Sequence, residues 1–139
     1  MASSSYPIRS NTHIRKTLAS YPLDANFFSI AMKPIKPHPA GWQYYVECDD
    51  AVHRIYRLKP LDMNENGINQ YMGSQWFISS HEFAKYLAEA RDRSMVQQYL
   101  EYAKHIMVAD EGFFTTVLRH SEFCSKHQNS NFLHLHFDR

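Results

Sequence analysis

The sequence predicts a single α/β domain in which short strands alternate with amphipathic helices. Three observations lead to this prediction: clusters of β-forming residues at 43–48 and 53–58, a short apolar run at 76–78, and apolar residues at helical spacing after residue 80. The chain has 139 residues, of which 44% are hydrophobic and 14% aromatic. That length suits one buried core and is too short for two comfortable domains.

The N-terminal third contains an extended segment, a helix and a strand candidate. Residues 6–9 are predicted to be extended, because a residue that precedes proline avoids the helical region. Ser10 or Asn11 then caps a helix that Pro22 ends. Residues 26–32 are rich in Phe and Ile and are predicted to form a strand.

The two clusters of β-formers flank an Asp-Asp pair at 49–50, which predicts a β-hairpin. Adjacent carboxylates also occur in cation sites, but without a third oxygen ligand nearby a turn is the more common explanation. The proline-containing residues 33–39 and the polar residues 59–70 are predicted to be loops.

Two helices are predicted after a turn at Gly73-Ser74 and a strand at 76–78. Ser79 and Glu82 have the spacing of a capping box at the start of the first helix. The apolar face of that helix consists of Phe83, Tyr86, Leu87 and Ala90. The second helix follows a charged break, with Met95, Val96, Tyr99, Leu100 and Ala103 at helical spacing.

A pair of carboxylates opens the last predicted helix. Asp110 is the expected N-cap and Glu111 the first helical residue, ahead of the apolar residues Phe113, Phe114, Val117 and Leu118. The positive end of a helix favours a charged carboxylate, so Glu111 would be able to accept a proton. Capping alone also explains an Asp-Glu pair at this position, and the residues by themselves leave both interpretations open.

The sequences Gly-Ser-Gln-Trp-Phe at 73–77 and Ala-Asp-Glu-Gly-Phe-Phe at 109–114 resemble glycosyltransferase family 14. This family contains the core-2/I-branching β-1,6-N-acetylglucosaminyltransferases and the peptide O-xylosyltransferases, and the likeness is closer to the xylosyltransferase branch. It extends over most of the chain through residues 6–11, 26–28, 47–49 and 131–139, in the family's order and spacing.

The resemblance implies a GT-A-like nucleotide-sugar transferase fold, a mixed sheet flanked by helices, of which residues 1–139 form the C-terminal portion. The nucleotide-binding half is then expected to precede residue 1. The implied activity is an inverting transfer of xylose or N-acetylglucosamine from a UDP-sugar to a protein or glycan hydroxyl, with no divalent metal firmly required. Family members are usually membrane-anchored and face the Golgi lumen, whereas this sequence shows neither a signal-peptide pattern nor a long apolar run.

The resemblance also implies roles for individual residues. Glu111 corresponds to the general base. The residues implied to bind the donor are Arg9 and Arg139, and those implied to bind the acceptor are Trp76, Phe137 and Asp110. The family has Trp where this chain has Phe137, so acceptor recognition is expected to differ.

Other function classes are weighed against this interpretation. A net charge of +1 without a basic cluster argues against a nucleic-acid binder that depends on phosphate contacts. The main alternative is a truncated, non-catalytic relative that binds glycans or a partner. A weaker one is a zinc protein built on His134 and His136, with a third ligand from His105, His120 or His127. Cys48 and Cys124 fit either a disulfide or two free thiols.

Overall fold

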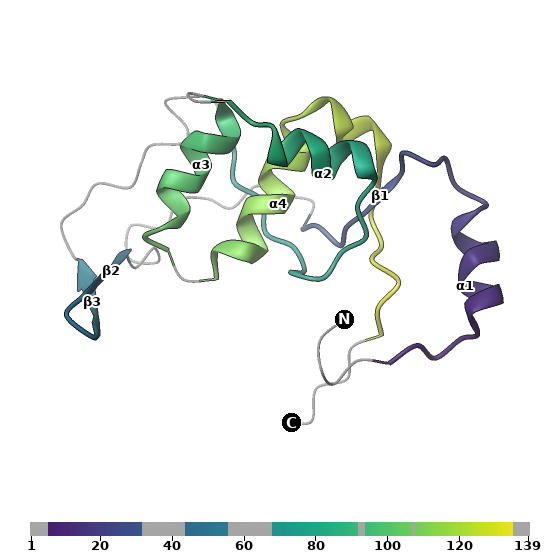
Figure 1. Cartoon of the computed structure of the whole chain (residues 1–139), viewed down its shortest axis with the longest axis horizontal. Coiled ribbons are helices and arrows are strands. Elements are labelled where there is room, and N and C mark those ends of the chain that lie inside the picture. The colour runs from purple at the N-terminus through teal and green to yellow at the C-terminus, as the bar shows by residue number, and fades with distance from the viewer. Residues whose placement is uncertain (1–5, 32–43, 56–67, 92–93, 107, 135–139) are drawn as a thin grey trace.

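The computed structural model describes residues 6–31, 44–55, 68–91, 94–106 and 108–134. These residues form helices together with two small two-stranded sheets. Three α-helices, α2, α3 and α4, pack at the centre, whereas α1 and the β2–β3 hairpin lie at opposite ends of the molecule (Figure 1).

The helices of the described residues are α1 (Asn11–Leu18), α2 (His81–Ala88), α3 (Met95–Ala103), α4 (Ala109–Arg119) and the 3-10 helix η1 (Glu122–Lys126). The strands are β1 (Asn26–Phe27), β2 (Tyr44–Cys48), β3 (Ala51–Ile55) and β4 (His127–Gln128). Strand β1 pairs in parallel with β4, and β2 pairs with β3 in antiparallel fashion.

The predicted strand at 26–32 is regular only in β1, although the segment around it is the centre of the fold. Phe27 exchanges two backbone hydrogen bonds with Ile78, at 2.8 and 3.0 Å, while β4 pairs on the other side. Two asparagine side chains replace further ladder bonds: Asn26 Oδ1 accepts from Ser80 N and Asn129 Oδ1 accepts from Ile30 N, both at 2.8 Å. Side-chain acceptors therefore take the places that a longer strand would occupy.

The predicted strand at 76–78 is wrong, because only Ile78 forms a β-bridge. Phe77 instead lies against the core, with its ring stacked on Phe28 at a centroid distance of 4.3 Å. Phe28 is fully buried and also meets Phe83 edge-on. The main core cluster consists of Phe28, Ile30, Phe83, Val96, Val117, Leu118 and Phe123.

The predicted helices form, with shifts at their ends. Helix α1 is capped by Ser10 and ends at Leu18, well before Pro22. In α3, Leu100 is exposed and Tyr102 is buried instead, because the core lies on the side of the helix that carries Val96 and Tyr99. The periodicity located the helix but placed one edge of its buried face wrongly.

The predicted hairpin is confirmed, with its turn at the Asp-Asp pair, although β3 begins at Ala51 and not at residue 53. The predicted strand residues 56–58 lie outside the described residues. Asp49 and Asp50 have φ values of 47° and 46°, the left-handed conformation that a tight two-residue hairpin turn requires. Asp tolerates this conformation better than most residues do. Tyr45 N donates to His105 O at 2.9 Å, which attaches the hairpin to the end of α3.

The cap of α2 is Ser80 and not Ser79. Ser80 Oγ accepts from Phe83 N at 3.1 Å, and Ser80 N is held by Asn26, so the tertiary contact selects one serine of the pair.

We expect Ser80→Ala to lower the free energy of unfolding by about 1 kcal/mol, because an N-cap hydrogen bond is lost. Ser79→Ala is the matched control and should have less than half that effect; equal losses in urea unfolding would contradict the assignment.

Candidate active site at the start of α4

The chain enters α4 through a residue in an unusual conformation. Val108 occupies the N-cap position with φ 55° and ψ 38°, and no side chain caps the helix. A β-branched residue in this left-handed region costs roughly 1–3 kcal/mol, and such outliers cluster at functional sites. The expected N-cap, Asp110, is therefore displaced into the first turn beside Glu111.

The two carboxylates of this turn differ in burial. Asp110 is exposed and Glu111 is half-buried. Within the described parts of the chain, neither carboxylate has a hydrogen-bond or ion-pair partner. Both lie in the first turn, where free backbone N–H groups attract negative charge.

The main chain of Glu111 is fixed by the turn that precedes Trp76. Gly73 N donates to Glu111 O at 2.9 Å. A Cβ at Gly73 would lie 2.5 Å from both Ser29 O and Thr115 Cγ2, which is closer than atoms can approach without moving the backbone. Only glycine allows the turn to lie this close to α4.

Two buried threonines of α4 hold the same segment, residues 69–74. Thr115 Oγ1 lies 2.8 Å from Tyr71 O and 3.0 Å from Glu111 O. Thr116 Oγ1 accepts from Tyr71 N at 3.0 Å. One turn later, His120 Nε2 lies 3.0 Å from Asn69 N and 2.9 Å from Asn69 O. One side of α4 thus satisfies the backbone of the 69–74 segment as a neighbouring strand would.

Gly112 brings α4 equally close to α3. A Cβ at Gly112 would lie 2.7 Å from the hydroxyl of Tyr99, which is almost fully buried. Burial raises the pKa of Tyr99 from its usual value of 10.0 to about 12, and a hydrogen bond with Thr116 opposes that rise. The hydroxyl therefore stays neutral at physiological pH and contributes to the contact between the two helices.

The other predicted site residues are distributed as follows. Trp76, 37% exposed, lies three residues after Gly73, and its carbonyl accepts from Asn131 Nδ2 at 3.2 Å. Arg9 is exposed ahead of α1, and its described hydrogen bond goes to the adjacent Ile8 O. Helix α1 lies apart from α4 (Figure 1). Phe137 and Arg139 lie outside the described residues.

The histidines of the zinc hypothesis are dispersed in the described structure. His120 binds the backbone of Asn69, His127 Nε2 lies 3.0 Å from Phe28 O, and His134 is exposed. Among the described residues, no group of three or more His, Cys, Asp and Glu side chains could hold a metal ion. His136 falls outside them. Cys48 and Cys124 are free thiols, the first exposed and the second half-buried.

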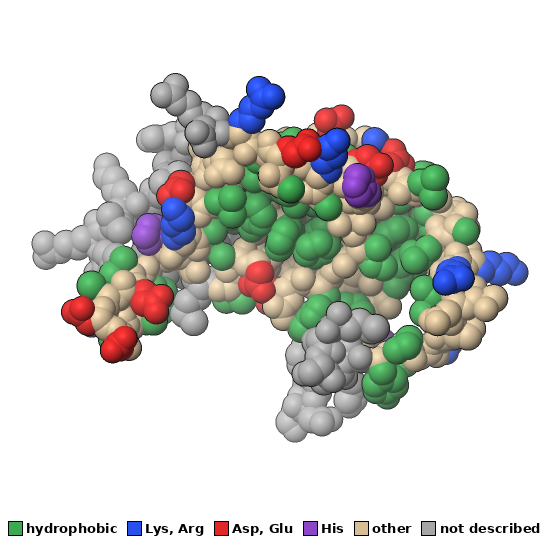
Figure 2. All heavy atoms as spheres, viewed as in Figure 1, with side chains coloured by type: hydrophobic (Ala, Val, Ile, Leu, Met, Phe, Trp, Pro, Cys, Tyr) green, Lys and Arg blue, Asp and Glu red, His purple; other side chains and the backbone are tan. Residues whose placement is uncertain are grey.

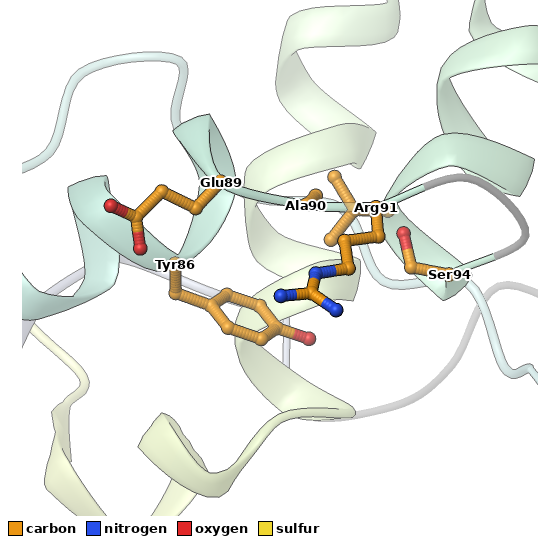
Figure 3. Close-up of a pocket in the computed structure, with 6 residues that line it drawn as sticks. Tyr86, Glu89, Ala90, Arg91 and Ser94 are labelled. Atoms are coloured by element: carbon orange, nitrogen blue, oxygen red, sulfur yellow. The ribbon is translucent and has the colours of Figure 1, made fainter.

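A separate cavity of about 280 Å³ lies between the end of α2 and the start of α3. It is lined by Tyr86, Glu89, Ala90, Arg91, Ser94 and Val96, none of which is a predicted site residue. The guanidinium of Arg91 lies toward the ring of Tyr86, whereas the carboxylate of Glu89 turns away (Figure 3).

The surface combines apolar and acidic areas. Figure 2 shows hydrophobic side chains over much of the face between the hairpin and α1. Acidic side chains gather at the hairpin, where Glu47, Asp49 and Asp50 are exposed. Of the helices that the structure describes, none combines the length and the apolar character needed to cross a membrane.

Sequence patterns did not identify Gly112, Thr115 and Thr116 as the residues that fix α4 against its neighbours. The sequence does carry a signal for the two threonines. Two adjacent β-branched polar residues are unfavourable in a helix interior unless their hydroxyls have partners. Their position on the face expected to be apolar indicates that this face meets backbone polar groups. The partner, the backbone of Tyr71, lies 44 residues from Thr115 in sequence, and no local pattern identifies it.

The chain is similar to known proteins along its whole length. The model of the Core-2/I-Branching enzyme family matches residues 1–139. Xylosyltransferase oxt of Drosophila melanogaster is 33% identical over 89 residues, which cover 63% of this chain and 10% of the fly protein. Xylosyltransferase 1 of Rattus norvegicus is 27% identical over 135 residues, 94% of this chain and 16% of the rat protein. The chain therefore spans only a small part of the length of these relatives.

The close contact at Gly112 gives a test of how α3 and α4 pack. We expect Gly112→Ala to destabilise the protein by about 1–3 kcal/mol, because the new methyl group overlaps the Tyr99 hydroxyl. In a Tyr99→Phe background, the next atoms are 3.9 Å away, so the same substitution should stabilise by up to about 1 kcal/mol through helix propensity. Urea unfolding of the four proteins measures this double-mutant cycle, and additive effects would contradict the contact.

The raised pKa of Tyr99 predicts a loss of stability at alkaline pH. The unfolded state releases this proton near pH 10.0 and the folded state near pH 12. The contribution of Tyr99 to the free energy of unfolding is therefore complete below pH 10 and declines as the pH rises toward 12. The total loss attributable to Tyr99 is roughly 3 kcal/mol. The unfolding free energy of the unsubstituted protein should therefore fall by this amount relative to that of Tyr99→Phe over this range; parallel curves would show that Tyr99 is not the titrating group.

Proposed function

The chain belongs to the Core-2/I-branching enzyme family, and from that premise we propose that it serves the inverting transfer of xylose or N-acetylglucosamine from a UDP-sugar to a protein or glycan hydroxyl. In this proposal residues 1–139 form the acceptor-side part of a GT-A-like catalytic domain that acts in the lumen of the secretory pathway. The family match and the xylosyltransferase relatives support the class of reaction. The choice between the two sugars is left to experiment.

The observation that carries the proposal is the first turn of α4. It presents two carboxylates without described partners on a main chain that Gly73 holds in place. Glu111 is assigned as the general base: its carboxylate removes the proton of the acceptor hydroxyl while that oxygen attacks the anomeric carbon. The bond from this carbon to the UDP oxygen breaks on the opposite face, and the configuration inverts. Such assistance contributes about 10²–10⁴-fold to the rate.

The remaining roles follow the family resemblance. Asp110, Trp76 and Phe137 are assigned to the acceptor, where an aromatic ring packs against the C–H face of a sugar. Arg9 and Arg139 are assigned to the donor, because a guanidinium pairs with phosphate oxygens. The proposal gives none of these residues a metal-binding role.

The test compares Glu111→Gln with the neighbouring Asp110→Asn. Transfer is measured in a protein that carries residues 1–139 together with the nucleotide-binding half, from UDP-xylose and from UDP-N-acetylglucosamine, each to a serine-containing peptide and to a glycan acceptor. We expect Glu111→Gln to lower kcat by about 10²–10⁴-fold while donor affinity in calorimetry is retained. Asp110→Asn should chiefly raise the acceptor KM, because Asp110 is assigned to acceptor binding and Glu111 to proton removal.

The outcomes separate the alternatives. Full transfer by Glu111→Gln would exclude Glu111 as the base. Glycan binding that is unaffected by Glu111→Gln, without any transfer by the unsubstituted protein, would favour the non-catalytic binding relative. Transfer from only one of the two UDP-sugars would identify the donor.

A further inference from the structure

Thr115 is placed to act on Glu111 through the main chain. Its side chain is fully buried, and its hydroxyl oxygen lies 2.8 Å from Tyr71 O and 3.0 Å from both Glu111 O and Gly112 O. The hydroxyl has one proton for these three acceptors, two of which lie in the first turn of α4 and one in the 69–74 segment. It therefore links that turn to the segment. Its methyl group packs against Gly73, where no Cβ fits.

The same segment leads directly to Trp76. Gly73 N donates to Glu111 O at 2.9 Å, and Ser74 N donates to Ser29 O at 3.0 Å. Ser74 Oγ then accepts from Trp76 N at 3.2 Å. The main chains of Glu111 and Trp76 are therefore joined through two residues, each anchored by a backbone hydrogen bond.

We propose that Thr115 is a positioning residue: it holds the main chain of Glu111 against the turn at 73–76 and so sets the separation between the general base and the acceptor-binding ring of Trp76. This inference rests on the proposed function. Thr115 touches neither substrate, and its hydroxyl acts through the carbonyl of Glu111. A displacement of about 1 Å in such an arrangement can cost about 100-fold in rate.

Thr116 provides a matched control in the same helix. It is also fully buried, and its hydroxyl also bonds the backbone of Tyr71, at 3.0 Å from Tyr71 N. It also hydrogen-bonds to Tyr99. No described hydrogen bond joins its side chain to Glu111. Loss of either hydroxyl leaves buried backbone groups without a partner, so both valine variants should lose similar stability.

The experiment compares Thr115→Val, Thr115→Ser and Thr116→Val by amide hydrogen exchange at Gly73 and by steady-state kinetics. We expect Thr115→Val to speed exchange at Gly73 by about tenfold, because the turn loosens from Glu111. Its kcat should fall about 10- to 100-fold with the donor KM unchanged. Thr115→Ser, which keeps the hydroxyl, should restore both values, and Thr116→Val should leave both near those of the unsubstituted protein.

Unchanged exchange at Gly73 in Thr115→Val would overturn the proposal, and so would faster exchange with an unchanged kcat. Equal losses of kcat in the two valine variants would mean that Thr115 has only a structural role, and this result would also overturn the proposal. If Thr115→Val does not fold, Thr115→Ser decides, since fast exchange at Gly73 in that variant contradicts a role for the hydroxyl. Absence of transfer by the unsubstituted protein would overturn the proposed function instead, and exchange at Gly73 would still decide whether Thr115 holds the turn.

Discussion

The contact between α4 and the backbone of residues 69–74 is the interaction on which the rest of this structure depends. This backbone pairs in part with residues 29–31, as it would in a sheet. The side chains of Thr115, Thr116 and His120 supply its further hydrogen bonds from a helix. Because these bonds come from one side of α4, the opposite side is free to enter the core with Val117 and Leu118 fully buried. A helix that is polar toward one neighbour and apolar toward another sets the distance between segments 44 residues apart.

This arrangement also explains where the backbone is strained. The 69–74 segment approaches α4 so closely that glycine is required at 73, and Tyr99 of α3 requires glycine at 112. The chain enters the same helix through the left-handed residue Val108. The left-handed conformation of Val108 costs roughly 1–3 kcal/mol, about what two or three buried hydrogen bonds contribute. The stable contacts lie along the helix and the strained residue lies at its start, beside Asp110 and Glu111. Stability and the proposed chemistry thus occupy different parts of one element.

Sequence patterns predicted the elements whose signal is local and missed those that long-range contacts decide. Helical spacing located α2, α3 and α4, and the Asp-Asp pair located the hairpin turn. The choice of Ser80 over Ser79 as a cap depends on Asn26, 54 residues away. Likewise, Asp110 fits the N-cap pattern, but Val108 occupies the N-cap position and Asp110 lies in the first turn, beside the Glu111 carbonyl that Gly73 N binds. For the candidate site, the sequence predicted the carboxylates and Trp76 but not the threonines whose hydroxyls bind the backbone of Tyr71.

A carboxylate that must accept a proton is best positioned through its main chain. An ion pair with Lys or Arg would also hold it in place, but it would favour the charged form and weaken the carboxylate as a base. In the described structure, Gly73 N donates to the carbonyl oxygen of Glu111 and Thr115 Oγ1 lies 3.0 Å from the same oxygen, whereas the carboxylate has no described partner. The scaffold therefore places the group while its carboxylate oxygens remain open to the acceptor hydroxyl of the proposed reaction.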